Sequence, residues 1–202
     1  MLSSAVKVSD SEIEGAGLIA GRFIPAGEIL YQFNSDEPPA HRHELIYWPK
    51  ETRQEFMKFA CQIGEDDFCF LQGEIKFINH SCDPSGWWET FGVLTARRDI
   101  QSGEEIAYDY STSDIMLHYS MECMCKSKSC RGTVTEKDYL LPDFQEKYAD
   151  HLPKHVAQAI QRKKTNEPDP QRGDVSQAPL QVIELARQTL SHAAEFQKKY
   201  AD

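Results

Sequence analysis

The sequence has no long apolar run. No segment approaches the roughly 18 to 20 apolar residues that a membrane span needs, and the N-terminus lacks a charged region followed by an apolar stretch. From this we expect a soluble protein that is not secreted and that is located inside the cell, in the cytoplasm or the nucleus. The sequence also contains no visible internal repeat and no low-complexity tract.

Basic residues are the minority among the charged ones. The chain has 22 Lys and Arg against 32 Asp and Glu, which gives a net charge of −10. Because phosphate binding relies on clustered Lys and Arg, we expect no direct nucleic-acid surface. A basic, lysine-containing protein or peptide is a better partner for an acidic chain. Alternatively, the acidic surface serves only to keep the protein soluble.

Disulfides are not expected to hold this chain together. Six cysteines could form three disulfides in a secreted protein, but 202 residues with 40% hydrophobic content can bury one sizeable core without them. We therefore expect reduced thiols in one main domain with an appendage. Cys61 and Cys69 lie outside any ligand spacing and are interpreted as small buried apolar residues.

Short strands broken by glycine turns are predicted for the first two thirds of the chain. They fall within residues 5–34, in a hairpin over residues 68–77 that turns at Gly73, and at residues 91–96. Residues 40–63 have mostly helical spacing, split near Pro49.

Helices are predicted after Gly132. Tyr148, Leu152, Val156 and Ile160 are spaced about four apart, and Pro153 is expected to restart the helix. An exposed linker is predicted over about 165–178, followed by a final helix from about 180 to 200.

Four cysteines have the number and spacing of a closed zinc site. Cys123, Cys125 and Cys130 lie within eight residues, and Cys82 supplies a fourth thiol. The close pair can hold one metal ion from a tight turn, and the other two complete a tetrahedron at about 2.3 Å per bond. The alternative is unliganded thiols in a loop, but exposed thiols this dense would be open to oxidation.

A metal at Cys82 would also position the residues that precede it. Asn79 and His80 lie just before Cys82 in the segment Phe-Ile-Asn-His-Ser-Cys-Asp-Pro. A metal shared with the later cysteines would bring them beside the segment that follows Tyr110, at the end of Gly-Glu-Glu-Ile-Ala-Tyr-Asp-Tyr.

Together with Gly15-Ala16-Gly17, these segments resemble the SET-domain lysine methyltransferases that have a cysteine-rich post-SET tail. The resemblance covers roughly residues 5–135 and implies a mostly β fold with added helices, built from short curved sheets and a pseudo-knot. It implies a SET domain over residues 1–118 with an insert at about 35–70, a post-SET zinc segment over 119–135, and a helical extension over 136–202.

The resemblance also implies S-adenosylmethionine as cofactor, beside Zn2+. In the family the Gly15-Ala16-Gly17 loop contacts the cofactor, and the residues matching Asn79 and His80 hold its amino group and adenine, the latter partly through backbone contacts. An amide such as Asn79 can accept from an ammonium and donate to a carboxylate, both of which that cofactor carries. The post-SET loop closes one wall of the site over cofactor and substrate channel.

Tyr110 and Tyr108 are the catalytic candidates. The resemblance makes Tyr110 the catalytic hydroxyl, and it places Tyr108, which also borders the cofactor, where the family controls how many methyl groups fit. The attacking lysine must be neutral, a state that a free amine with a pKa near 10.4 reaches only about one part in a thousand at pH 7.4; burial beside a sulfonium lowers that pKa. We expect mono- or dimethylation. The alternative to a catalytic role is that Tyr108 and Tyr110, two positions apart, simply lie on the same face of a strand.

Several features leave the substrate open. Ser85 stands where the family often has Asn, residues 86–94 are short for the usual hairpin, and no pre-SET cysteine cluster is present. Trp87, Trp88 and Phe91 could line a substrate groove or belong to the core. Besides the enzyme, a non-catalytic peptide-binding module and a SET fold acting on a small molecule are alternatives.

Overall fold

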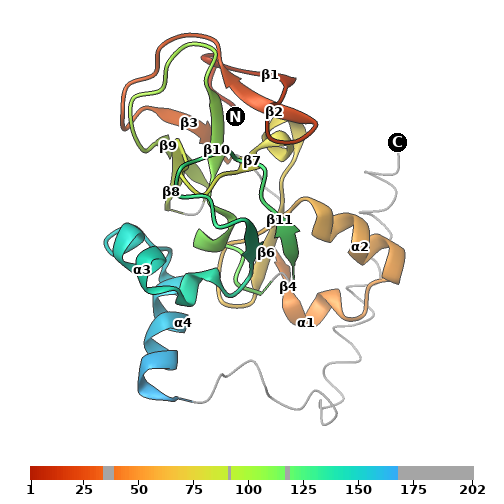
Figure 1. The fold of residues 1–202 in the computed structure, drawn as a ribbon. Coiled ribbons are helices and arrows are strands. Elements are labelled where there is room, and N and C mark those ends of the chain that lie inside the picture. The colour runs from red at the N-terminus through yellow and green to blue at the C-terminus, as the bar shows by residue number, and fades with distance from the viewer. Residues whose placement is uncertain (34–38, 91, 117–118, 168–202) are drawn as a thin grey trace.

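The computed structural model describes residues 1–33, 39–90, 92–116 and 119–167. Four small sheets form its β part (Figure 1). The first contains β1 (Val6–Asp10), β2 (Ala16–Ala20), β10 (Glu105–Tyr108) and β7 (Asn79–His80), paired in that order. β1, β2 and β10 pair antiparallel, whereas β7 and β10 run parallel, with Ala107 opposite Asn79 and Tyr108 opposite His80. This parallel pair brings two segments far apart in the sequence into one ladder.

Two further sheets have three strands each, and a fourth has two. β9 (Val93–Ala96) lies between β3 (Ile29–Gln32) and β8 (Gly86–Thr90), and β6 (Asp67–Phe70) lies between β4 (Ala40–His41) and β5 (Ala60–Gln62). β11 (Ser120–Glu122) pairs with β12 (Thr133–Thr135), and the cysteine-rich loop connects them.

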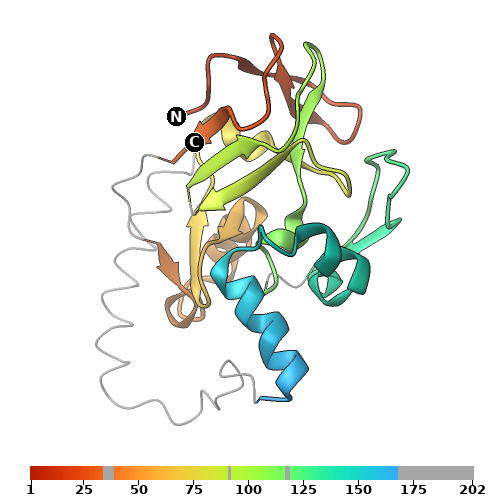
Figure 2. The same cartoon turned by 90° about the vertical axis from the view of Figure 1, so that its left-hand side faces the viewer.

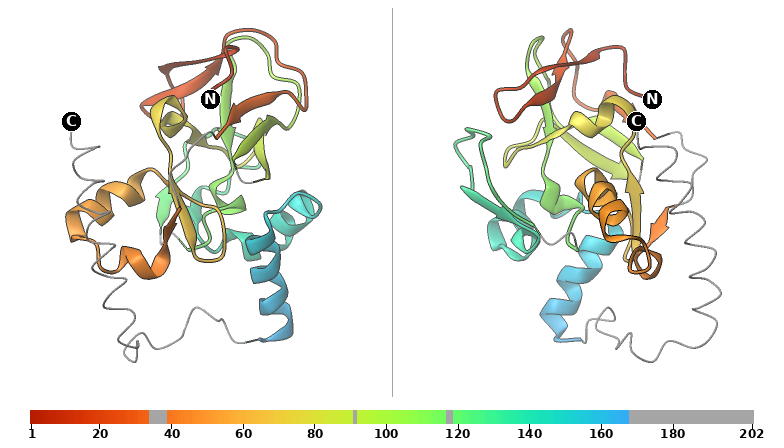
Figure 3. Two further views of the ribbon diagram at one scale, coloured as in Figure 1. Left: turned by 180° about the vertical axis from the view of Figure 1, so that it is seen from behind. Right: turned by 90° about the vertical axis from the view of Figure 1, so that its right-hand side faces the viewer.

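Helices flank the sheets on two sides. α1 (Arg42–Leu45) and α2 (Lys50–Lys58) lie on one side, and α3 (Pro142–Tyr148) and α4 (Lys154–Thr165) lie on the other (Figures 1 and 3). In Figure 2, α4 lies below the β8–β9 hairpin. Short 3-10 turns are η1 (Gly73–Phe77), η2 (Tyr110–Thr112) and η3 (Asp138–Leu140). Within the described ranges, no helix has the length and apolarity needed to span a bilayer.

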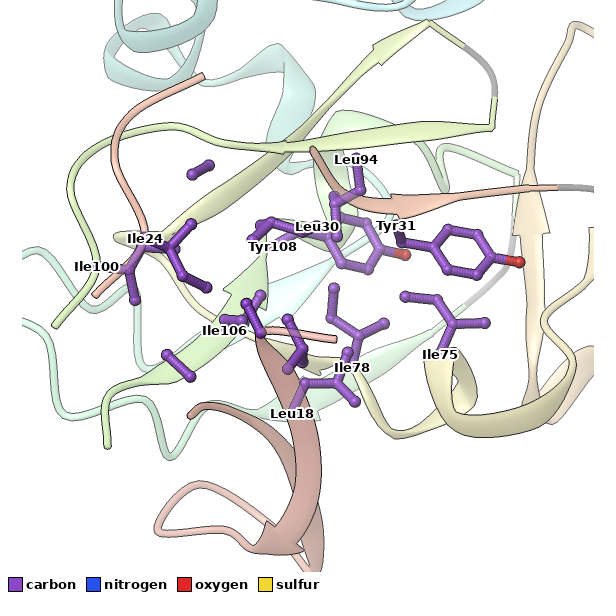
Figure 4. Close-up of a cluster of buried hydrophobic side chains, with 14 of the residues drawn as sticks. Leu18, Ile24, Leu30, Tyr31, Ile75, Ile78, Leu94, Ile100, Ile106 and Tyr108 are labelled. Atoms are coloured by element: carbon purple, nitrogen blue, oxygen red, sulfur yellow. The ribbon is translucent and has the colours of Figure 1, made fainter. Parts of the chain in front are cut away.

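The main core lies between the first two sheets and η1 (Figure 4). Leu18 and Ile106 from the first sheet and Leu94 from the second are fully buried there. Tyr108 belongs to the same core, with 3% of its surface exposed. Because apolar residues surround it, its ring is held rigidly.

The helix predictions hold next to the two prolines, but both ends of the stretch over residues 40–63 are wrong, because Ala40–His41 and Ala60–Gln62 form the strands β4 and β5 that pair with β6. The helical stretch is split at Pro49, which precedes α2, and Pro153 precedes α4. A proline ring lacks the amide hydrogen of a helix interior but fits the start of a helix, which explains both boundaries. The predicted linker and the final helix lie almost entirely in residues 168–202, which are outside the described residues. Phe91 is also outside the described residues.

Two local predictions are wrong. The hairpin at Gly73 does not form, because Ile75 and Ile78 are the buried residues and their spacing of three is that of the 3-10 turn η1. Residues 86–96 do form a hairpin, although the segment looked too short. β8 and β9 pair antiparallel, with Gly86 opposite Ala96 and Trp88 opposite Leu94.

Candidate active site and cysteine cluster

Two tyrosines meet where β10 ends. Tyr108 is the last residue of β10 and Tyr110 begins η2, and their ring centroids are 4.9 Å apart. Both line a cavity of about 200 Å³, together with Lys76, Ile78, Asp114, Tyr119 and Met121 among others. The structure therefore places both predicted catalytic side chains at one cavity.

Each tyrosine hydroxyl already has an acceptor for its proton. The Tyr110 hydroxyl donates to the Ile78 carbonyl oxygen at 2.9 Å, and the Tyr108 hydroxyl donates to Asp114 Oδ2 at 3.0 Å. Burial raises the pKa of both phenols well above the ordinary value. Both hydroxyls are therefore neutral near pH 7 and are hydrogen-bonded.

Asn79 ties the glycine loop to the sheet. Its Nδ2 lies 3.1 Å from the Ala16 carbonyl oxygen, 3.2 Å from the Glu14 carbonyl oxygen and 2.8 Å from Glu105 Oε1. Glu105 also accepts from the Ser11 hydroxyl at 2.8 Å. The predicted cofactor loop and Asn79 are therefore in direct contact.

The two glycines of this loop are needed for different reasons. Gly15 has a φ of +54°, in the left-handed region that other residues enter at a cost. Gly17 has ordinary backbone angles, but a Cβ there would lie 2.3 Å from Glu105 Oε1. A side chain at position 17 would displace the carboxylate that holds Asn79.

His80 faces the interior, away from solvent. Its Nδ1 accepts from the Tyr110 backbone N–H at 3.2 Å, so the proton lies on Nε2, which is 3.3 Å from Cys82 Sγ. Burial lowers the pKa of His80 to about 4, and the ring is neutral. With both ring nitrogens engaged, only its backbone is free for a cofactor contact.

The four predicted cysteine ligands converge. The sulfur atoms of Cys82, Cys123, Cys125 and Cys130 all lie within 4.8 Å of one another. Tetrahedral bonds of about 2.3 Å require sulfur atoms about 3.8 Å apart, and Cys82 and Cys123 are separated by 3.7 Å. The cluster therefore fits a zinc ion.

Backbone amides support the cluster. Arg131 N–H donates to Cys82 Sγ and Gly132 N–H donates to Cys130 Sγ, both at 3.4 Å. Such donors stabilise thiolates, the form that binds metal. Burial raises the pKa of Cys82 to about 11, so metal binding there would release a proton.

A buried ion pair joins the cysteine segment to the tyrosine segment. Arg131 donates two hydrogen bonds of 2.8 Å to Asp109, whose side chain is 0% exposed. Burial alone would lower the pKa of Arg131, but the Asp109 carboxylate raises it above its ordinary value. Tyr148 of α3 donates to the same carboxylate at 3.0 Å, and Lys147 donates to the Cys82 carbonyl oxygen. The described part of the C-terminal extension therefore packs against the site.

The tryptophans contact other parts of the chain. Trp88 packs edge-on against Tyr31 and Tyr108, and Trp87 stacks on His151 with ring centroids 3.4 Å apart. Trp88 is a partly buried residue packed against the main core. These contacts favour the core interpretation for Trp88, whereas Trp87 packs on His151 outside the core.

Sequence reasoning missed Asp109, Asp114 and Arg131. Asp109 lies between the two predicted tyrosines, and its position inside the motif was an available signal. Asp114 and Arg131 carry no local pattern that sets them apart from surface charges, because their partners are distant in the sequence or lie in the core.

Comparison with known proteins agrees with this geometry. Residues 15–111 match the SET domain family. The chain contains a SET domain. Its fold is the SET fold of short sheets with added helices.

The SET domain has curated relatives. The chain is 33% identical over 143 residues to a histone-lysine N-methyltransferase, H3 lysine-36 specific, from Yarrowia lipolytica, covering 64% of this chain and 18% of that protein. It is 26% identical over 165 residues to a protein of the same description from Saccharomyces cerevisiae, covering 77% of this chain and 22% of that protein. The chain thus spans about a fifth of the length of these relatives.

A solved structure is also similar. It is described as KRYPTONITE in complex with mCHG DNA and SAH, with 21% identity and a TM-score of 0.48, covering 65% of this chain and 29% of that one.

Proposed function

We propose that this chain is an S-adenosylmethionine-dependent protein-lysine N-methyltransferase. The observation that carries the proposal is the meeting of Tyr108 and Tyr110 at one cavity, within a domain whose relatives are named lysine methyltransferases. A neutral lysine amine would enter this cavity. Because the relatives are named for histone H3, histone tails are the first substrates to test.

The residues would divide the work as follows. Gly15-Ala16-Gly17, Asn79 and the backbone of His80 would hold the cofactor, which supplies a methyl group on a sulfonium. The Tyr110 hydroxyl would hold the lysine amine in line, which is the main requirement of a displacement between two bound reactants. Apolar and aromatic walls disfavour the ammonium and so lower the pKa of the lysine.

The cysteine cluster would hold one structural zinc ion. All four positions would be filled by sulfur, leaving none for a substrate or water. The ion would fix the β11–β12 loop against the segment around Cys82, whose neighbours include Asn79 and His80.

Incubation with labelled cofactor tests the proposal. The protein would be mixed with core histones, with a total protein extract and with a metabolite extract, and the label located by mass spectrometry. Label on lysine supports the proposal, label only on a small molecule would replace it, and no label from either would favour the binding module. Tyr110→Phe should reduce turnover at least a hundredfold with little change in cofactor affinity, because its bond matters mainly in the transition state.

A further inference from the structure

Asp114 is a buried carboxylate directly behind one of the two tyrosines. It lies four residues after Tyr110, and 4% of its surface is exposed. Its Oδ1 accepts from the Gln62 backbone N–H at 2.8 Å, and its Oδ2 accepts from the Tyr108 hydroxyl at 3.0 Å.

This arrangement fixes the direction of both hydroxyl groups. A phenol has one proton, and each proton here is donated to a group in the cavity wall, Asp114 for Tyr108 and the Ile78 carbonyl oxygen for Tyr110. What remains on each oxygen is acceptor capacity. The two tyrosines therefore offer the cavity two acceptors and no donor.

A nucleophilic amine needs hydrogen-bond acceptors around it rather than donors. It attacks with its lone pair, so a hydroxyl that donated to the lone pair would block the reaction, whereas one that accepts from an N–H leaves the lone pair free. A neutral unmethylated lysine has two N–H groups, a monomethylated one has one, and a dimethylated one has none. Two acceptors match the unmethylated amine best.

We propose that Asp114 is a positioning residue that keeps the Tyr108 hydroxyl an acceptor and thereby favours the first methyl transfer over later ones. This inference rests on the proposed function. Asp114 acts through Tyr108 and does not touch the reacting atoms.

An aspartate suits this role better than its amide. An ionised carboxylate only accepts, and the groups around this one are donors. In an Asp114→Asn variant the single amide oxygen would face the Gln62 N–H, and the amide NH2 would face Tyr108. The Tyr108 oxygen would then accept from the amide, and its proton would be free to turn into the cavity. The substitution would change the Tyr108 hydroxyl from an acceptor to a donor toward the cavity, and it leaves the shape of side chain 114 almost unchanged.

A double-mutant cycle tests the inference. The rate of the first methylation and the ratio of di- to monomethylated peptide would be measured for wild type, Asp114→Asn, Tyr108→Phe and the double variant. Asp114→Asn should lower the first rate about tenfold, as expected for one misdirected hydrogen bond, and raise the ratio. In the Tyr108→Phe background the same change should alter both quantities less than twofold. Asp143→Asn, on the exposed side of α3, removes the same charge and should match wild type.

The possible failures are distinguishable. If wild type transfers no methyl group to protein, the proposed function fails. If wild type is active and Asp114→Asn equals it, or lowers the rate equally in both backgrounds, the inference fails. A measurement without turnover keeps it testable: the 13C resonance of the Tyr108 Cζ atom should shift in Asp114→Asn and stay unchanged in Asp143→Asn. An unshifted resonance in Asp114→Asn would overturn the inference.

Discussion

Removal of Arg131 should destabilise the fold strongly. The Asp109 side chain is fully buried and accepts two bonds of 2.8 Å from Arg131, which is itself 17% exposed. Removing one member of a buried pair costs about 3–5 kcal/mol, because the remaining charge is left without its partner. Tyr148 still donates to Asp109 in Arg131→Met, so we expect a loss near the lower limit, about 3 kcal/mol.

Urea unfolding followed by tryptophan fluorescence measures this loss, and saturating zinc in every sample keeps metal release out of the comparison. Arg131→Met combined with Asp109→Asn should be more stable than Arg131→Met alone, because the fully buried Asp109 charge is gone; Asp138, which pairs with Arg131 at 2.7 Å, loses that partner in both variants. Arg22→Met removes an ion pair whose arginine side chain is 54% exposed, and its midpoint should equal that of wild type. A loss under about 1 kcal/mol in Arg131→Met, or no recovery in the double variant, would refute the reasoning.

Three further outcomes are expected. Purified protein should contain one zinc per chain by elemental analysis, and Cys123→Ser should lose it while Cys61→Ser keeps it; equal zinc in both variants would contradict the cluster. Asn79→Ala should weaken binding of S-adenosylmethionine by about 1.5–3 kcal/mol in calorimetry, and unchanged affinity would remove the assignment. Burial raises the pKa of Asp114 from 3.8 to about 6, so its contribution to stability is complete below pH 3.8 and is lost as the pH rises through about 6. The free energy of unfolding of wild type minus that of Asp114→Asn should therefore decrease over that window, since His80, whose pKa is lowered to about 4, titrates alike in both proteins.

Features that depend on few residues could be predicted from the sequence. The convergence of the four cysteines could be predicted because three of them lie close together in the sequence and a closed zinc site takes four ligands. The helix boundaries at Pro49 and Pro153 followed from the backbone chemistry of proline. The juxtaposition of Asn79 with the tyrosine segment followed from the position of Cys82 in the same motif, and the β7–β10 ladder places them together.

Features that depend on tertiary packing could not be predicted from the sequence. Ile75 and Phe77 alternate as in a strand, but burial of Ile75 with Ile78 selects a 3-10 turn. Asp114 is preceded by a polar Ser-Thr-Ser segment, and only the fold shows that its partner is the Tyr108 hydroxyl. A charge in the core cannot be told from a surface charge by local pattern, since its partners come from other segments.

The short parallel ladder brings the cysteine cluster, the Gly15-Ala16-Gly17 loop and the tyrosine segment together. Asn79 holds the glycine loop, His80 receives the backbone N–H of Tyr110, and Cys82 belongs to the sulfur cluster, all within four residues. A displacement of Cys82 moves His80, because its Nε2 contacts the sulfur, and with it the backbone that begins η2. Loss of zinc should therefore disturb Tyr110 even though no sulfur ligand contacts its ring. Chelation should lower turnover before it unfolds the main core, because the cysteines belong to a separate cluster of buried residues.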